Sequence, residues 1–258
     1  MKNQWFISIK KNEGELDLSN LKHNYPPKGY YWADPFLYSK DGKDYIFYEL
    51  YDYKKGVIAY SEINDDMSFT DPTVILELDT HISYPFLIED SNKLYMIPES
   101  GKDVNIKIYE CTSFPNKWKF VKNIVPKAWT GDNNIIKLNN KYYLFTTSQP
   151  QLRHNLAILS SNSLLGEYKL EVNKEEMNSR SGGAFKIIED KLIRFCQDSS
   201  NGYGSGIIIK SIELNDKEYN SFIMDEIQPN WHPDIFGTHH LDFNDKYIVI
   251  DGKRKIND

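Results

Sequence analysis

Carboxylates, histidines and arginines recur in this sequence at the start of short apolar segments and at the ends of the segments that follow them. The candidates for chemistry are Asp34, Glu49, Glu99, Asp132, Arg180, His239, His240, Asp242 and Arg254. Crowded carboxylates shift one another's pKa values, and arginines orient anions through paired hydrogen bonds. If these residues meet in space, their types are suited to acid–base chemistry.

The carboxylates also have structural interpretations. Asp34 precedes Pro35, and Asp-Pro is a common turn pair, while Asp132 lies in a polar Gly-Asp-Asn-Asn segment that could equally be a turn. Glu49 and Glu99 follow apolar segments and could bond neighbouring backbone. Their shared position in a repeat favours a functional interpretation.

The other candidates carry the same ambiguity. His239 and His240 could ligate or catalyse, or could fill the interior as satisfied imidazoles. Arg180 could bind an anion or form a buried ion pair with a carboxylate. Trp32 and Trp129 could stack on sugar rings, although aromatic residues at such junctions also serve packing.

The elements that must position these residues repeat five times. Aligned without a gap, the copies open at Asp34, Tyr84, Asp132, Gly182 and Gly237. Nine residues later stand Lys43, Lys93, Lys141, Lys191 and Lys246, and fifteen residues later stand Glu49, Glu99, Thr147, Gln197 and Gly252. Each copy reads as two strands joined by a turn, and the period of 48 to 55 residues is typical of a propeller blade.

The sequence therefore predicts an all-β chain: one five-bladed β-propeller over residues 1–258, with four strands per blade and minimal helix. The fifth copy stops after two strands, and Trp5–Ile9 is a spare strand. We expect it to complete blade five, because an open edge invites aggregation. Residues 11–31 are expected to form a loop. First strands line a propeller axis, so the candidate residues should converge in a funnel at one end.

Composition excludes several classes of function. A net charge of −6 argues against nucleic-acid binding, which needs clustered basic charge. No signal-peptide pattern and no apolar run near the length of a membrane span are present, so no membrane insertion is expected. Cys111 and Cys196 show no metal-ligand spacing. We expect a reduced cytoplasmic protein with no metal and no cofactor.

Several motifs carry a resemblance to a known family. Ala33-Asp34-Pro35-Phe36 and the Gly131-Asp132-Asn133 opening resemble the five-bladed propellers of glycoside hydrolase family 43. Ser83-Tyr84-Pro85-Phe86 with Pro98-Glu99, and His239-His240-Leu241-Asp242, look nearer to the N-terminal propeller domain of glucosamine inositolphosphorylceramide transferases and its bacterial relatives. The resemblance covers almost the whole chain.

Family 43 implies an inverting pair, with Asp34 as the base and Asp132 as the residue that tunes its pKa. Its acid is a glutamate that opens blade four, where this chain has Ser179-Arg180-Ser181-Gly182-Gly183. An unactivated glycoside needs a proton on its leaving oxygen. Either Glu99 or Glu49 supplies it, or the leaving group is a phosphate or nucleoside diphosphate stabilised by arginines and histidines.

The preferred hypothesis is a carbohydrate-active enzyme that transfers a sugar from a phosphate-activated donor in glycan biosynthesis. The alternatives are a family 43-like inverting glycoside hydrolase and a non-catalytic glycan-binding propeller. Asp34 would be the base, Asp132 its tuner or a hydroxyl ligand, and Glu99 the acid or a second hydroxyl ligand. Arg180 and His240 would hold the anionic group. Substrate contacts are expected from Glu49, His239, Asp242, Arg254, Trp32 and Trp129, and the partners would be a carbohydrate or nucleotide sugar and other glycan-biosynthesis enzymes.

Overall fold

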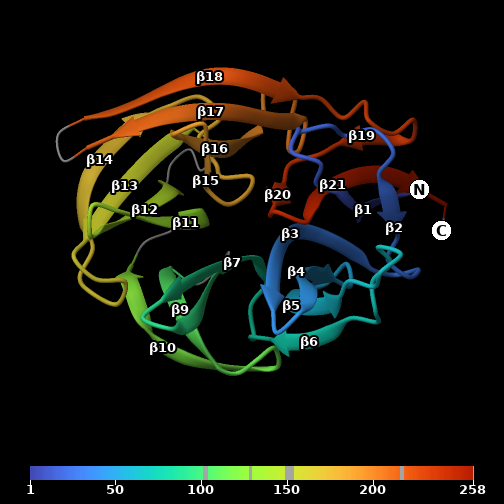
Figure 1. Cartoon of the computed structure of the whole chain (residues 1–258), viewed down its shortest axis with the longest axis horizontal. Helices are drawn as coiled ribbons and strands as arrows, with labels where there is room; N and C mark the ends of the chain where they lie inside the picture. Colours follow the sequence, from blue (N-terminus) through green and yellow to red (C-terminus); the bar gives the residue numbers. More distant parts are fainter. Residues whose placement is uncertain (101–103, 128–129, 149–153, 216–217, 258) are drawn as a thin grey trace.

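The computed structural model describes residues 1–100, 104–127, 130–148, 154–215 and 218–257. Within these ranges the chain forms strands β1 to β21 and no α-helix, so none of the described residues belongs to a helix that could span a membrane. The strands form five sheets arranged as a ring around a central axis (Figure 1). The predicted five-bladed propeller is therefore confirmed.

Four blades follow the chain in order. Blade one contains β3 (Tyr31–Lys40), β4 (Lys43–Tyr51), β5 (Gly56–Glu62) and β6 (Thr73–Leu76). Blade two contains β7 (Ile82–Asp90), β8 (Lys93–Ser100), β9 (Asn105–Ser113) and β10 (Lys117–Pro126). Blade three contains β11 (Thr130–Leu138), β12 (Lys141–Ser148), β13 (Asn155–Ser161) and β14 (Lys169–Glu175). Blade four contains β15 (Lys186–Ile188), β16 (Lys191–Asp198), β17 (Gly206–Leu214) and β18 (Tyr219–Ile227).

Blade five joins the two ends of the described chain. It contains β19 (Ile235–Gly237), β20 (Leu241–Phe243), β21 (Tyr247–Ile256), β1 (Lys2–Lys11) and β2 (Lys22–Asn24). β1 runs antiparallel to β21 from the Lys2–Ile256 pair to the Lys11–Tyr247 pair, and the two strands lie side by side in Figure 1. This pairing confirms the predicted closure by the N-terminal strand.

The expectation of a loop over residues 11–31 was incomplete. β2 lies within that segment and pairs with β1 through Ile7–Asn24, Ser8–His23 and Ile9–Lys22. It supplies the outer strand that blade five would otherwise lack. Its three residues are too short and too polar to show a strand pattern, so only tertiary pairing defines it.

The first strands of blades one to three share a backbone irregularity. Pairing shifts register between Ala33 and Phe36, and at the corresponding places in β7 and β11. Inside these bulges Asp34, Tyr84 and Asp132 adopt positive φ values of 55°, 49° and 44°. Such backbone is uncommon outside glycine and is a real outlier for a residue as bulky as tyrosine. Bulges and strained residues concentrate where a strand must re-aim a side chain, so three blades present their opening residue in the same unusual way.

Candidate functional site

Three blades meet at the Arg180 guanidinium. Nε lies 2.5 Å from Asp132 Oδ2, and Nη2 lies 2.9 Å from Glu99 Oε2. The Asp132 backbone N–H also donates to Glu99 Oε2 at 2.8 Å, and the Gln197 amide donates to Asp132 Oδ2. A guanidinium suits this arrangement because its planar fork can serve two acceptors at once. Arg180 therefore holds the two carboxylates in fixed positions.

The two carboxylates differ in protonation. Burial raises the pKa of Asp132 well above its usual value, and the neighbouring Glu99 charge adds to this, although Arg180 opposes it. Burial acts in the same direction on Glu99, but Arg180 and the hydrogen bonds from Asp132 outweigh it and leave the pKa of Glu99 lowered. Glu99 is thus an ionised hydrogen-bond acceptor, which suits a hydroxyl ligand. It is not suited to be the acid, which must hold a proton.

Asp34 belongs to a second buried chain of contacts. Its Oδ1 lies 3.4 Å from His239 Nε2, and His239 Nδ1 lies 2.6 Å from Asp251 Oδ2. Asp251 Oδ1 accepts the backbone N–H groups of His239 and His240 at 2.9 and 3.0 Å. The Tyr84 N–H donates to Asp34 Oδ2 at 3.2 Å. Blades one, two and five are joined through these bonds.

This chain separates the protonation states of its members. Burial raises the pKa of Asp34 to about 6, with the nearby His239 offsetting part of the effect. Burial would also raise the pKa of Asp251, but the His239 charge and its hydrogen bond lower it overall. Burial alone would lower the pKa of His239, and Asp251 reverses this into a raised value. Asp34 is left as a carboxylate that titrates near neutrality, the property of a general base.

One group in the described residues has the composition of a metal site. Asp34, His239 and Asp251 each offer a ligand atom, and these atoms lie within 4.8 Å of one another. However, His239 Nδ1 already bonds Asp251, and Asp251 is saturated by backbone donors. Because a cation would have to displace these bonds, we describe the group as a hydrogen-bonded chain.

Electrostatic coupling joins these groups into one site. Arg180 and Glu99 both influence the pKa of Asp34, and Glu49 is influenced by Asp34, Glu99 and Asp251. We call the set the axial cluster: Asp34, Glu49, Glu99, Asp132, Arg180, His239 and Asp251. It lies where first strands begin and second strands end, around the centre of the ring (Figure 1).

The family follows from the sequence match. The model of the N-terminal domain of glucosamine inositolphosphorylceramide transferase 1 matches residues 19–232. The chain belongs to this family. In this chain blade four opens with Arg180, where the resemblance to family 43 calls for a glutamate.

Longer proteins contain the same domain. The chain is 29% identical over 199 residues to glucosamine inositolphosphorylceramide transferase 1 of Arabidopsis thaliana, which covers 72% of this chain and 26% of that protein. The protein of the same name from Oryza sativa subsp. japonica is also 29% identical, and the match covers 72% of this chain and 27% of that protein. The chain thus spans about a quarter of the length of the curated relatives it matches.

Solved structures share the fold. A family 117 glycoside hydrolase from Zobellia galactanivorans superposes with a TM-score of 0.64 at 12% identity, covering 100% of this chain and 94% of that one. A family 43 β-1,3-galactosidase gives 0.60 at 15% identity, with coverages of 81% and 83%. An α-L-arabinofuranosidase from Lactobacillus brevis gives a TM-score of 0.59 at 18% identity, covering 77% of this chain and 79% of that one. At these identities the likeness concerns the propeller fold alone.

His240 lies on the axis of this family's propeller without facing solvent. It is fully buried against Phe36 and Tyr84, with ring centroids 4.6 and 5.2 Å away. Burial lowers its pKa to about 3, so the ring is neutral at physiological pH. A neutral, enclosed imidazole cannot hold an anion by charge. His240 is therefore packed in the interior, but not as a satisfied imidazole: its Nδ1 lies 3.8 Å from Asp34 Oδ1, and neither ring nitrogen has a hydrogen-bond partner among the described residues.

Three other candidates, Asp242, Arg254 and Trp32, lie outside the cluster's contacts. Asp242 bonds Lys186 Nζ at 2.6 Å and accepts the Leu37 N–H, which ties blades one, four and five together. Arg254 donates to Gln4 Oε1 at 2.8 Å, across the β1–β21 pair. Trp32 is 6% exposed and packs on Tyr48 in the core between blades one and five. Trp129 lies outside the described residues.

Four residues near the cluster escaped the sequence prediction: Gln197, His81, Tyr203 and Asp251. Gln197 stands at the same repeat position as Glu49 and Glu99, so its signal was present. Tyr203 lies in the loop before β17, 39% exposed, with its ring edge-on to His239 at 5.1 Å. No repeat position marks this loop.

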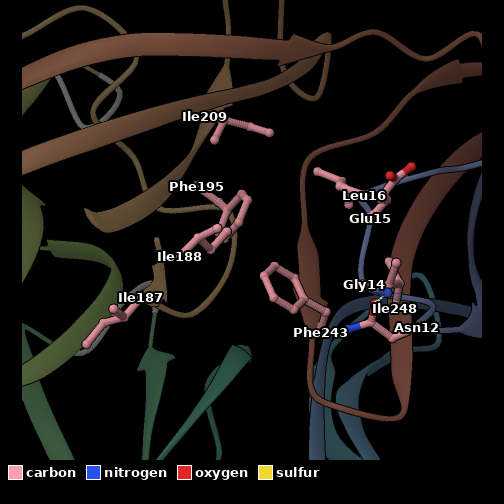
Figure 2. Close-up of a pocket in the computed structure, with 10 residues that line it drawn as sticks. All are labelled: Asn12, Gly14, Glu15, Leu16, Ile187, Ile188, Phe195, Ile209, Phe243 and Ile248. Atoms are coloured by element: carbon pink, nitrogen blue, oxygen red, sulfur yellow. Dashed lines mark hydrogen bonds between the residues drawn. The ribbon is translucent and has the colours of Figure 1, made fainter. Parts of the chain in front are cut away.

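An apolar pocket elsewhere in the domain is separate from the cluster. Its volume is about 320 Å³, and its walls include Leu16, Ile188, Phe195 and Phe243 (Figure 2). It lies between blades four and five beside the segment that follows β1. None of the axial-cluster residues lines it, so it has no part in their chemistry.

Proposed function

We propose that this domain is a carbohydrate-active enzyme that acts at a glycosidic bond beside the axial cluster. The preferred form is glycosyl transfer from a phosphate-activated sugar in glycan biosynthesis. The observation that carries the proposal is Asp34, a buried carboxylate with a pKa of about 6, fixed by His239 and the Tyr84 N–H. The relatives' name, a glucosamine transferase, agrees in reaction type.

Asp34 would accept the proton of the incoming hydroxyl as its oxygen attacks the sugar. Proton removal by a positioned base contributes about 10²–10⁴-fold in rate. Glu99, held ionised by Arg180, would accept a hydrogen bond from a sugar hydroxyl, and Asp132 would tune the field around Asp34.

Arg180 would stabilise the departing group. Its Nε and Nη2 serve Asp132 and Glu99, whereas Nη1 makes no hydrogen bond with any residue that the structure describes. The side chain retains 16% exposure, so this face can reach a ligand. Fixed cationic donors stabilise developing negative charge on a leaving phosphate without any need for proton transfer. The arginine at the blade-four opening favours a phosphate leaving group for this reason.

Hydrolysis is the second candidate, and it is favoured by the buried carboxyl group of Glu49, which could protonate a hydroxyl leaving group. A non-catalytic glycan-binding propeller is the third, because ionised carboxylates such as Glu99 also grip sugar hydroxyls. The three differ in turnover and in the leaving group that they require.

The test is a panel of nucleotide sugars, sugar phosphates and aryl glycosides, assayed with the native chain, Asp34→Asn and the exposed control Asp65→Asn. Transfer predicts turnover of phosphate donors that Asp34→Asn abolishes while ligand binding persists. Turnover of aryl glycosides alone would indicate hydrolysis. Binding without turnover of any substrate would leave the glycan-binding function, and full activity in Asp34→Asn would remove Asp34 from the mechanism.

A further inference from the structure

A second acid–base pair lies at the edge of the axial cluster. Glu49 Oε1, at the end of β4, lies 3.2 Å from Nε2 of His81, which immediately precedes β7. Glu49 is 5% exposed, whereas the His81 side chain is 38% exposed. The glycosyl-transfer mechanism above uses neither residue as an acid, and only the hydrolysis alternative gives Glu49 that role. The pair therefore connects the buried cluster with solvent.

The hydrogen bonds fix which nitrogen of His81 carries the proton. The Gly56 backbone N–H donates to His81 Nδ1 at 3.0 Å, so Nδ1 is an acceptor. A neutral imidazole with an unprotonated Nδ1 must carry its hydrogen on Nε2, which faces Glu49. Burial lowers the pKa of His81, in agreement with a neutral ring. The His81 Nε2–H thus lies beside Glu49 Oε1, with 3.2 Å between the nitrogen and the oxygen.

Gly56 shows that the pair is built into the fold. A Cβ at this position would lie 2.6 Å from Glu49 Oε1, 2.7 Å from His81 Cε1 and 2.7 Å from the Ile82 carbonyl oxygen. Such contacts are far shorter than atoms tolerate. Only glycine at the start of β5 lets Glu49 and His81 approach each other with their backbone donor in place.

The second oxygen of Glu49 is available for a proton. Neither oxygen of Glu49 accepts a hydrogen bond from any residue within the described ranges: Oε1 is enclosed and has only the 3.2 Å contact with His81 Nε2, which leaves Oε2 free to hold a proton. Burial raises the pKa of Glu49 well above its usual value, and the Asp34, Glu99 and Asp251 charges act in the same direction, against Arg180. Tyr31 and Tyr203 also face this carboxyl group, and their hydroxyls add no positive charge. A proton on Oε2 removes a charge that the site cannot solvate.

We propose that Glu49 is the proton donor of the axial cluster and that His81 is its positioning residue. The inference rests on the proposed function, because it names the acid of that same site. As the bond between the sugar carbon and the leaving oxygen breaks, the electron pair stays on that oxygen, which takes the proton of Oε2. The acceptor oxygen forms the new bond to carbon and releases its proton to Asp34. The Glu49 carboxylate that forms remains beside His81 Nε2–H, and solvent restores both protonation states.

Neutral Glu49 also explains how a cluster of carboxylates admits a phosphate. One more ionised carboxylate beside Glu99, Asp34 and Asp251 would add to the repulsion of an anionic group, whereas a protonated carboxyl donates a hydrogen bond to it. A phosphate leaving group needs only that hydrogen bond. A hydroxyl leaving group takes the proton outright.

Carbon-13 NMR of the full chain tests the protonation state without a substrate, with Glu49→Gln used to assign the signal. We expect Glu49 to lose its proton at a higher pH than the exposed glutamates, whose pKa values lie near 4.3. Nitrogen-15 shifts should show neutral His81 with its hydrogen on Nε2. Titration of Glu49 together with the exposed glutamates, or a hydrogen on His81 Nδ1, would overturn the proposal.

Variants of His81 test positioning. His81→Ala should raise the pKa of Glu49 further, because the carboxylate loses its donor, and His81→Gln should restore part of the shift. An unchanged titration in His81→Ala would remove His81 from the proposal. Gly56→Ala should disturb both resonances by forcing the pair apart.

Activity provides the final comparison once the substrate panel identifies a turned-over compound. Glu49→Gln should lower kcat about 100-fold or more for poor leaving groups, and less for good ones. Glu62→Gln, a surface change in the same blade where Glu62 pairs with Lys43, should leave kcat unchanged. Equal rates in Glu49→Gln and the native chain would refute the donor role. Should the native chain turn over none of the panel, the proposed function fails, and the NMR titration still decides whether Glu49 carries the proton.

Discussion

Deleting residues 1–10 tests how far the ring depends on its closure by β1. The deletion removes the strand that pairs with β21 along its whole length and leaves β2 without a partner. The matched control removes only Met1 and Lys2, whose side chains are exposed. Both variants keep every residue of the other four blades.

The expected cost follows from the side chains that are lost. Trp5, Phe6, Ile7 and Ile9 are between 0% and 5% exposed. Burying one such side chain contributes about 1.5–3 kcal/mol, so the four together contribute roughly 6–12 kcal/mol. Native domains are stable by about 5–15 kcal/mol in total. The deletion therefore removes an amount comparable with the whole stability of the domain.

Far-UV circular dichroism with thermal and urea unfolding measures the effect. We expect the chain lacking residues 1–10 to show no cooperative transition, and the control to melt within a few degrees of the native protein. Phe6→Ala gives a milder version, with an expected loss of about 3–5 kcal/mol. A truncated chain that melts like the native one would show that β1 is an appendage and that blade five is stable without it.

Three further predictions concern the cluster. Arg180→Gln leaves Asp132 and Glu99 without their cation and should lower the free energy of urea unfolding by about 3–5 kcal/mol. Arg180→Lys should lower it less but should weaken activity on anionic donors. Equal stability of Arg180→Gln and the native chain would contradict the ion-pair description. Tyr84→Phe loses the hydroxyl bonds to Asn134 and Gly183 and should destabilise the fold by about 1–3 kcal/mol. The control Tyr30→Phe, at an exposed tyrosine, should have no effect. Equal melting temperatures of the two variants would refute the role of these bonds. Stability should also depend on pH in two opposed ways. The lowered pKa values of Glu99 and Asp251 stabilise the fold above their unfolded pKa values near 4, and this is lost as pH falls, whereas the raised pKa of Asp34 makes its ionisation oppose folding as pH rises from about 4 to about 6. Asp34→Asn removes this unfavourable ionisation, so its free energy of unfolding should rise by up to about 3 kcal/mol relative to the native chain between pH 4 and pH 7. Identical pH profiles of stability in the two proteins would refute the raised pKa of Asp34.

The architecture could be predicted because its signals are local and repeated. Lys43 and its counterparts mark the hairpin turns, and the aromatic and branched residues after them mark second strands. Glu49, Glu99 and Gln197 share one repeat position and do converge on the cluster. Repetition thus identified Glu49 and Glu99 as site residues from the sequence, and the same repeat position pointed to Gln197, which bonds Asp132.

The residues that blade five supplies to the site could not be aligned correctly before the pairing of its strands was known. Leu241 pairs with Ile250, and these two residues are closer in sequence than the corresponding pair Phe36 and Phe47. The ungapped alignment therefore matched Gly237 to Asp34, whereas His239 is the residue that lies against Asp34. Asp251 stands one residue before the aligned Gly252, so the repeat position did not mark it.

Long-range geometry decides the remaining features. Tyr84 combines a positive φ with hydroxyl bonds to Asn134 and Gly183 in other blades, and no local pattern records these bonds. His81 gains its meaning from Gly56 and Glu49, and each of the three belongs to a different part of blades one and two. Chemistry of this kind becomes visible only when the strands are placed.

The pairing of β1 with β21 also has a consequence for folding during synthesis. β1 leaves the ribosome before the other strands described here, yet its partner strand spans Tyr247–Ile256, so β1 has no partner while four blades are made. Throughout that interval Phe6, Ile7 and Ile9 have no native surface to cover them, and contacts so distant in sequence form slowly. The polar Lys2, Asn3, Lys10 and Lys11 at its two ends flank this apolar stretch with charge, in the manner of residues that guard a nascent strand against association with another chain.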